Sequence, residues 1–209
     1  MWPWEHAIVG YLAYSAFSHL YYRRSPSGLE AFAVVFASVL PDLIDKPLAW
    51  EFGVFETGYA LGHSILFAVP LSVAVGLLAR RLDRTEAGIA FALGYLLHLP
   101  SDVLDGYLRG GRVRTELMLW PVQTVGSAEE RIGFADEFWR LFEGYQRALL
   151  AGELSTYVRV QLALAALVVV VWLYDGAPVL RESLGYCRRL VSSVVSRPKR
   201  PLEANEDRE

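Results

Sequence analysis

The sequence predicts an all-α integral membrane protein, a bundle of about five transmembrane helices with one amphipathic helix on its surface. Two observations predict this class: 54% of the 209 residues are hydrophobic, and the mean hydropathy is positive, which is too apolar for an ordinary soluble domain. A third is that five long apolar runs cover residues 4–22, 29–44, 62–79, 86–100 and 158–174. Several runs are shorter than the ~20 apolar residues of a usual span, although flanking Trp and Tyr can extend them through the interface. A buried helical bundle in a soluble protein is the alternative.

Four parts are expected along the chain. Residues 1–125 form a four-span bundle, 126–156 an amphipathic outer helix, 157–176 the fifth span, and 177–209 a basic cytoplasmic interfacial helix with a disordered tail. The outer helix is predicted from a capping box, Ser127 with Glu130, and from apolar residues at helical spacing. These apolar residues are Phe134, Phe138, Leu141, Phe142, Tyr145 and Leu149. Packing against the bundle and closing over a site as a lid remain alternatives for this helix.

Basic residues predict the orientation of the spans. Arg23 and Arg24 follow the first span, an arginine cluster at 80–84 follows the third, and further basic residues follow the fifth. Because positive residues gather on the cytoplasmic side, we expect a multi-pass cell-membrane protein with a cytoplasmic C-terminus and its N-terminus outside. The net charge of -3 predicts no nucleic-acid partner. Cys187 is alone, so neither a disulfide framework nor a cysteine metal site is expected.

Histidines and aspartates stand at alternating ends of the first four runs. His6 opens the first run, Asp42 and Asp45 close the second, His63 opens the third, and His98 with Asp102 closes the fourth. Since consecutive membrane helices run antiparallel, this order brings all six side chains to one face of the bundle. That face is predicted to be the outer one. His19 lies at the opposite end and is expected to anchor the interface, while Asp175 is expected to be an ordinary surface residue.

The donor types predict a divalent metal site. His98 and Asp102 are four residues apart and Asp42 and Asp45 three apart, so each pair shares one face of a helix. A single such residue is usually a cap or solvated, but ionisable groups inside membrane spans are costly and point to a functional site. Imidazole and carboxylate donors without thiolate suit zinc best, and also manganese or ferrous iron.

Five short motifs follow one another in the first 121 residues. They are His6, then Leu40-Pro41-Asp42 with Asp45, then Gly62-His63-Ser64, then Gly94-Tyr95-Leu96-Leu97-His98 with Asp102, and finally Leu119-Trp120-Pro121. In this order the chain resembles the membrane-bound metal-dependent hydrolases, the group that includes the LexA-binding, inner-membrane-associated hydrolases. More remotely, Trp4 and His6 followed by Asp and His ligands resemble zinc-dependent phospholipases C and related nucleases.

The chain departs from the family pattern at two places. Lys46 follows Asp45 where the family usually has His, and Gly58 and Tyr59 replace a His-Arg pair. These departures leave few ligands for a second metal, so a single ion is expected, or a second ion held by Asp105 or Glu56. The resemblance implies hydrolase activity, and the remoter likeness implies phosphoester substrates.

The leading hypothesis is metal-assisted hydrolysis of a phosphoester such as a lipid headgroup or a lipid-linked phosphate. In it, His6, Asp42, Asp45, His63, His98 and Asp102 form the metal site, with Asp45 also the general base. Arg112 and Arg114 would hold the phosphate by bidentate geometry. Membrane lipid is the expected partner, and the sequence fixes no oligomeric state. The alternatives are a metal-binding membrane protein without chemistry, using the ion structurally or transporting it, and a scaffold that binds a partner through its outer helix or inner tail.

Overall fold

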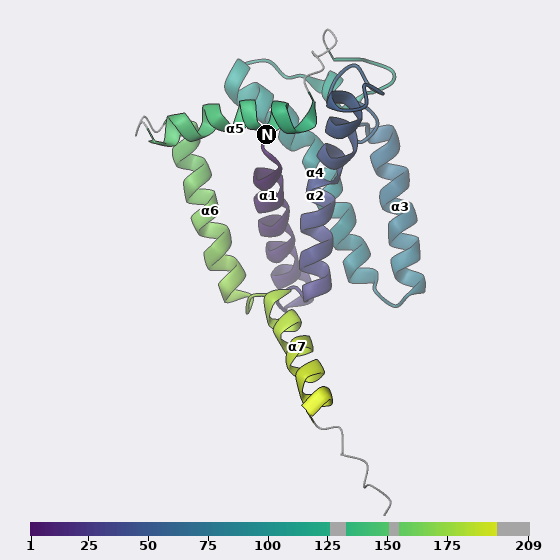
Figure 1. Cartoon of the computed structure of the whole chain (residues 1–209). Helices are drawn as coiled ribbons and strands as arrows, with labels where there is room; N and C mark the ends of the chain where they lie inside the picture. The colour runs from purple at the N-terminus through teal and green to yellow at the C-terminus, as the bar shows by residue number, and fades with distance from the viewer. Residues whose placement is uncertain (126–132, 151–154, 196–209) are drawn as a thin grey trace, which may run out of the picture.

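In the computed structural model (Figure 1), which describes residues 1–125, 133–150 and 155–195, every regular element of the described chain is a helix. The helices are α1 (Pro3–Phe17), α2 (Gly28–Trp50), α3 (Ile65–Arg81), α4 (Thr85–Gly110), α5 (Phe134–Leu150), α6 (Thr156–Tyr174) and α7 (Leu180–Val195). A short π-helix η1 (Ser18–Tyr22) continues α1, and a 3-10 turn η2 (Thr115–Met118) follows α4. The predicted all-α class is confirmed.

The five predicted spans correspond to α1 with η1, α2, α3, α4 and α6. Among the described residues, two helices, α4 and α6, are long and apolar enough to cross a membrane by length and composition. The five-span topology therefore stays a prediction. Both α2 and α4 run beyond their expected ends, because Pro41, Pro47 and Pro100 lie inside continuous helices rather than ending them. As a result Asp42 and Asp102 lie within helices and not at their ends.

The helices pack closely where a glycine of one helix faces a neighbouring helix. In the bundle α2 and α4 run along each other, α1 packs against both, α3 packs on α4, and α6 packs on α1 (Figure 1). At Gly94 of α4 an added Cβ would lie 2.4 Å from the carbonyl oxygen of Val34 in α2. At Gly10 of α1 it would lie 2.0 Å from Ser38 Oγ. Small residues of this kind let helix backbones approach in membrane bundles, and here they draw α1, α2 and α4 together.

One end of the bundle carries the start of α1, the ends of α2 and α4, and the start of α3. Helix α5 lies across this end (Figure 1). Its apolar face meets the first turn of the chain: Phe138 packs edge-on against Trp2, with ring centroids 6.3 Å apart, and Phe142 against Trp4 at 6.5 Å. The predicted amphipathic helix is thus present over Phe134–Leu150 and covers the donor end. The predicted capping box at Ser127 and Glu130 lies outside the described residues.

The opposite end of the bundle holds a buried polar cluster that the sequence did not predict. Asp175, expected at the surface, is 2% exposed. It accepts hydrogen bonds from Tyr11 Oη and Ser15 Oγ, both at 2.8 Å, and its Oδ1 lies 2.6 Å from His19 Nε2. The three partners are four residues apart along α1 and η1, so they form one stripe facing the end of α6. Helix α7 leaves the bundle at this end (Figure 1), and the predicted disordered tail after it lies outside the described residues.

Candidate metal centre

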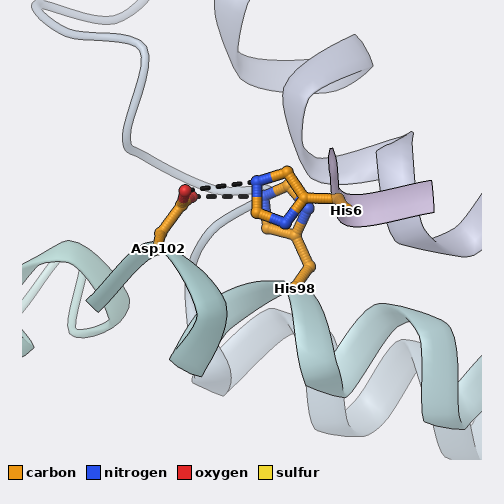
Figure 2. A group of neighbouring side chains, drawn as sticks. All are labelled: His6, His98 and Asp102. Carbon is orange, nitrogen blue, oxygen red and sulfur yellow. Dashed lines mark ion pairs between the residues drawn. The ribbon is translucent and has the colours of Figure 1, made fainter. Parts of the chain in front are cut away.

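Helices α1 and α4 contribute the first three donors. The His6 and His98 rings stack with centroids 3.6 Å apart, and both face Asp102 (Figure 2). His6 Nε2 lies 3.2 Å from Asp102 Oδ1, and His98 Nε2 lies 3.4 Å from Asp102 Oδ2. All three side chains are buried. The four-residue spacing of His98 and Asp102 on α4 therefore places both groups against His6, as the sequence predicted.

The segment between α2 and α3 adds His63 to this group, and α2 adds Asp42. His63 Nε2 lies 3.1 Å from His98 Nε2 and 3.4 Å from both Asp42 Oδ1 and Asp102 Oδ2. His98 Nε2 lies farther, 4.0 Å, from Asp42 Oδ1. Ligand atoms at tetrahedral corners, each about 2.0–2.1 Å from a zinc ion, stand roughly 3.3 Å apart. Most of the separations among these four donor atoms match that spacing.

The far nitrogens of the two central rings are held by oxygen acceptors. His63 Nδ1 lies 2.8 Å from Asp45 Oδ2, and His98 Nδ1 lies 2.7 Å from the carbonyl oxygen of Ser38. Because a carbonyl oxygen or a carboxylate only accepts, each ring donates from Nδ1, and in the neutral ring this leaves the lone pair of Nε2 facing the other ring. Outer partners of this kind fix the ring orientation of metal-bound histidines. Two facing lone pairs suit a cation between them.

Several buried donor atoms of the cluster have no hydrogen-bond partner within the described chain. They are both ring nitrogens of His6, Asp42 Oδ2 and Asp102 Oδ2. Burying such atoms without a partner is costly, and a metal ion would satisfy one ring nitrogen of His6 and the carboxylate oxygens that coordinate it. The donors form two overlapping ligand groups, His6 with His98 and Asp102, and Asp42 with His63 and His98, each with its ligand atoms within 4.8 Å of one another. The two groups share His98.

Asp45, expected both as a ligand and as the general base, is in neither ligand group. Its Oδ2 lies 2.7 Å from the backbone nitrogen of Ala60 and 3.0 Å from that of His63, and its Oδ1 lies 2.8 Å from that of Gly62. Together with the contact to the His63 ring, these hydrogen bonds occupy both oxygens. The contacts thus favour a positioning role, in which Asp45 holds the backbone and the ring of His63 in place.

Two further motifs support the same loop. Tyr95 Oη donates to the carbonyl oxygen of Gly62 at 2.7 Å, and Ser64 Oγ donates to that of Trp120 at 2.5 Å. The ring of Trp120 packs edge-on against Phe55, with centroids 5.6 Å apart. Tyr95 and Trp120 therefore hold the segment that carries His63, and neither joins a ligand group.

The chain also matches a family model over residues 1–179, that of the YdjM inner membrane protein family. The chain belongs to the YdjM inner membrane protein family. The match includes all five motifs and extends through α6, so the membrane class that the composition predicted is supported at the level of the family. No curated protein and no solved structure matches the chain.

In this YdjM family member, a cavity of about 460 Å³ lies between α2, α4 and α5 and reaches the donor cluster at Asp42. The positions that depart from the hydrolase pattern, Lys46, Gly58 and Tyr59, all line it. Lys46 Nζ lies 2.7 Å from Asp42 Oδ1, one turn away on α2. A cation therefore stands beside the ligands where the hydrolase pattern has a further histidine.

The arginines that line this cavity are not the expected ones. Arg112 and Arg114 are exposed beyond the end of α4 and do not line the cavity, and Arg114 pairs with Glu116 at 3.2 Å. Arg109 lines it instead and pairs with Asp105 at 2.9 Å. In the sequence, Arg109 could have been identified by its position four residues after Asp105. That spacing places Arg109 on the same helix face as the donors only if α4 continues through Pro100. Of the residues suggested for a second ion, neither Asp105 nor the exposed Glu56 joins a ligand group.

Proposed function

We propose that this YdjM family member is a membrane-embedded, metal-dependent hydrolase that cleaves a phosphoester such as a lipid headgroup or a lipid-linked phosphate. The observation that carries the proposal is the convergence of His63 Nε2 and His98 Nε2 on the carboxylates of Asp42 and Asp102, with both Nδ1 atoms already hydrogen-bonded. A divalent ion, zinc first and manganese or iron next, supplies Lewis-acid chemistry that activates water and polarises a phosphoryl oxygen.

The protein side of the reaction follows from the contacts of the cluster. His6, Asp42, His63, His98 and Asp102 hold the ion, and Asp45 orients His63 instead of acting as the general base. The cavity at Asp42 gives a substrate access to the ligands, and Lys46 on its wall offers a positive charge to an anionic group. Helix α5 covers this cavity with Phe134, Phe138 and Leu141, which limits the entry of water.

A structural ion is the second candidate. A structural site closes its coordination shell with protein ligands, whereas a catalytic site keeps an open position. Four protein donors at tetrahedral spacing fit a closed shell, whereas the cavity that reaches Asp42 supports an open arrangement with fewer of them bound. Transport has less support, because the stretches 71–78 of α3 and 162–171 of α6 are almost entirely apolar and offer no row of polar groups along the bundle.

The membrane placement is part of the same proposal. The cluster lies at the end of the bundle opposite Arg23, Arg24 and the arginines at 80–84. With the positive residues in the cytoplasm, the chain crosses the membrane five times and its site faces the outer leaflet. A site at that depth reaches a lipid headgroup without drawing the lipid out of the bilayer.

Elemental analysis of the detergent-purified protein tests the metal site. We expect roughly one equivalent of zinc or manganese, lost in His98→Ala and Asp42→Ala because both remove ligands. His19→Ala is the matched control, since His19 lies at the opposite end of the bundle, and it should keep the metal. A screen of phosphoesters with the metal-loaded protein tests turnover. Full activity in metal-free protein, or no metal uptake on titration, would overturn the proposal.

A further inference from the structure

A second cavity, of about 270 Å³, lies between α1, α4 and α6 and has no part in the proposed metal chemistry. Its wall is mainly apolar and includes Ile8, Val9, Leu104, Leu108, Val160 and Leu164. Val160, on α6, is 53% exposed. On α4, Leu104 and Leu108, which also line the cavity, are 56% and 71% exposed. The apolar cavity therefore opens between α4 and α6 toward the side of the bundle that would face lipid.

The two cavities adjoin each other at α4. Asp105 lines both, Arg109 lines the first, and Leu108 lines the second. Arg109 also packs over the ring of Tyr157, 4.1 Å from its centroid, and donates a hydrogen bond to its hydroxyl group. Tyr157 lines the apolar cavity. The Arg109–Tyr157 contact thus marks the point where the charged cavity meets the apolar one.

The polar groups in the apolar cavity are largely satisfied from within the chain. Glu5 accepts hydrogen bonds from the backbone nitrogen of Trp2, from Tyr157 Oη and from Gln161 Nε2. Gln161 Oε1 is buried without a hydrogen-bond partner. Polar residues such as Ser101 and Asp105 also line the cavity, but most of its surface is apolar, as a hydrocarbon chain requires.

We propose that the two cavities form one binding site for a membrane phospholipid. Its phosphate lies in the first cavity against Lys46 and Arg109, and one of its acyl chains lies in the second, between α1, α4 and α6. Three observations carry this assignment: the cations Lys46 and Arg109 at one end, beside Asp42, Asp105 and Glu137, the mainly apolar lining at the other, and the shared wall at Asp105. This inference rests on the proposed function, which supplies the reaction. It adds the class of substrate and the residues that bind the phosphate.

Photolabelling tests the acyl-chain position without requiring turnover. The probe is phosphatidic acid with a diazirine in one acyl chain, added in small amounts to the full-length protein in detergent. Ala165 lines the apolar cavity, while Ala163, two residues away on α6, is exposed and does not. We expect Ala165→Phe to reduce labelling of α4 and α6 about tenfold, as the loss of ~1.4 kcal/mol of binding would. Ala163→Phe should label like the wild type.

Equal labelling of Ala165→Phe and Ala163→Phe would overturn the assignment, because the probe would then be sampling the lipid-facing surface and not the cavity. Ala165→Leu keeps the experiment decisive if the phenylalanine variant does not fold, since its smaller side chain should give an intermediate loss. An isoprenoid chain would be indicated instead if a polyisoprenyl phosphate displaced the probe and long-chain phosphatidic acid did not.

A second arm tests the phosphate position. Lys46→Gln and Arg109→Gln should each reduce labelling by the phosphatidic acid probe and leave labelling by a diazirine diacylglycerol, which has no phosphate, unchanged. Arg112→Gln is the matched control, since Arg112 is exposed and lines neither cavity. Equal labelling by the two probes in all three variants would overturn the role of Lys46 and Arg109.

Measurements of turnover with two substrates distinguish a failure of this inference from a failure of the proposed function. If the protein is a phosphoester hydrolase, Ala165→Phe should lower kcat/KM for a long-chain phospholipid and leave that for the chain-less p-nitrophenyl phosphate unchanged. A protein that binds no metal and hydrolyses neither substrate contradicts the proposed function, while the photolabelling result still decides whether the lipid site exists.

Discussion

His63 and His98 place their Nε2 atoms 3.1 Å apart, and each ring is fixed from behind, one by Asp45 and the other by the carbonyl oxygen of Ser38. Neither ring can turn its other nitrogen inward without losing its buried hydrogen bond. The fixed geometry of the pair therefore suits a cation between the two rings. The consequences of this arrangement can be measured separately at the ligands, at their supports and at the helix contacts that bring them together.

Asp45→Asn should weaken zinc binding by about 10–100-fold without abolishing it, because outer partners orient a histidine ligand but do not bind the ion. A competition titration with a chromophoric chelator measures this change. Asp83→Asn is the matched control, since Asp83 lies in the turn between α3 and α4 at the opposite end, and it should bind zinc like the wild type. Complete loss of zinc in Asp45→Asn would instead show that Asp45 is itself a ligand.

Metal removal should lower the melting temperature and leave the protein folded. A ligand present at 100 times its Kd stabilises the native state by about 2.7 kcal/mol, whereas the helix contacts of α1, α2 and α4 do not depend on the ion. Thermal unfolding followed by circular dichroism, with and without chelator, measures the shift. His98→Ala should show no shift. A helical signal that collapses on chelation at room temperature would favour the structural-ion candidate.

Gly94→Leu should lower both the melting temperature and the zinc affinity. Its side chain would meet the Val34 carbonyl oxygen and push α4 away from α2, and His98 lies one turn farther along α4. Gly76→Ala is the matched control, because an added Cβ there meets nothing within 4 Å, so helix propensity predicts stability equal to or above the wild type. Wild-type zinc affinity in Gly94→Leu would show that the ligands adjust independently of this contact.

Asp175→Ala should destabilise the protein by about 1–3 kcal/mol, because two buried hydroxyl donors, on Tyr11 and Ser15, lose their acceptor and the partly buried His19 loses its partner. The melting temperature should fall by several degrees while the zinc content stays unchanged, since the cluster lies at the other end of the bundle. Asp136→Ala removes an exposed aspartate of α5 and should change neither quantity. If the two variants unfold at the same temperature, the Asp175 cluster contributes no stability.

Cysteine labelling in intact cells should place the two ends of the bundle on opposite sides of the membrane. Cys187, the single cysteine, is exposed on α7 and should react with a membrane-impermeant maleimide only after the cells are opened. In a Cys187→Ser background, Trp139→Cys on α5, where Trp139 is 57% exposed, should react in intact cells. The reverse pattern would place the metal centre on the cytoplasmic side.

The sequence by itself determined the helical class and most of the donor cluster that forms the candidate metal centre. Apolar runs set the helices, and the alternating positions of His6, Asp42, His63, His98 and Asp102 predicted that their side chains meet, because antiparallel helices bring alternate ends together. These predictions rest on local periodicity and chain direction, and both follow from the order of residues along the chain. The sequence likewise showed that Lys46 stands where the hydrolase pattern usually has a histidine.

Only the tertiary structure decided which polar groups hold the ligands and which line the cavities. Asp42 and Asp45 are three residues apart and chemically alike. Asp42 nevertheless faces the other donors, whereas Asp45 faces the backbone of the loop that carries His63. Asp175 is buried because the end of α6 returns to α1, and Arg109 lines the cavity at Asp42, which Arg112 and Arg114 do not, because α4 continues through Pro100. Each outcome depends on contacts between segments far apart in the chain, and no local pattern of residues encodes such contacts.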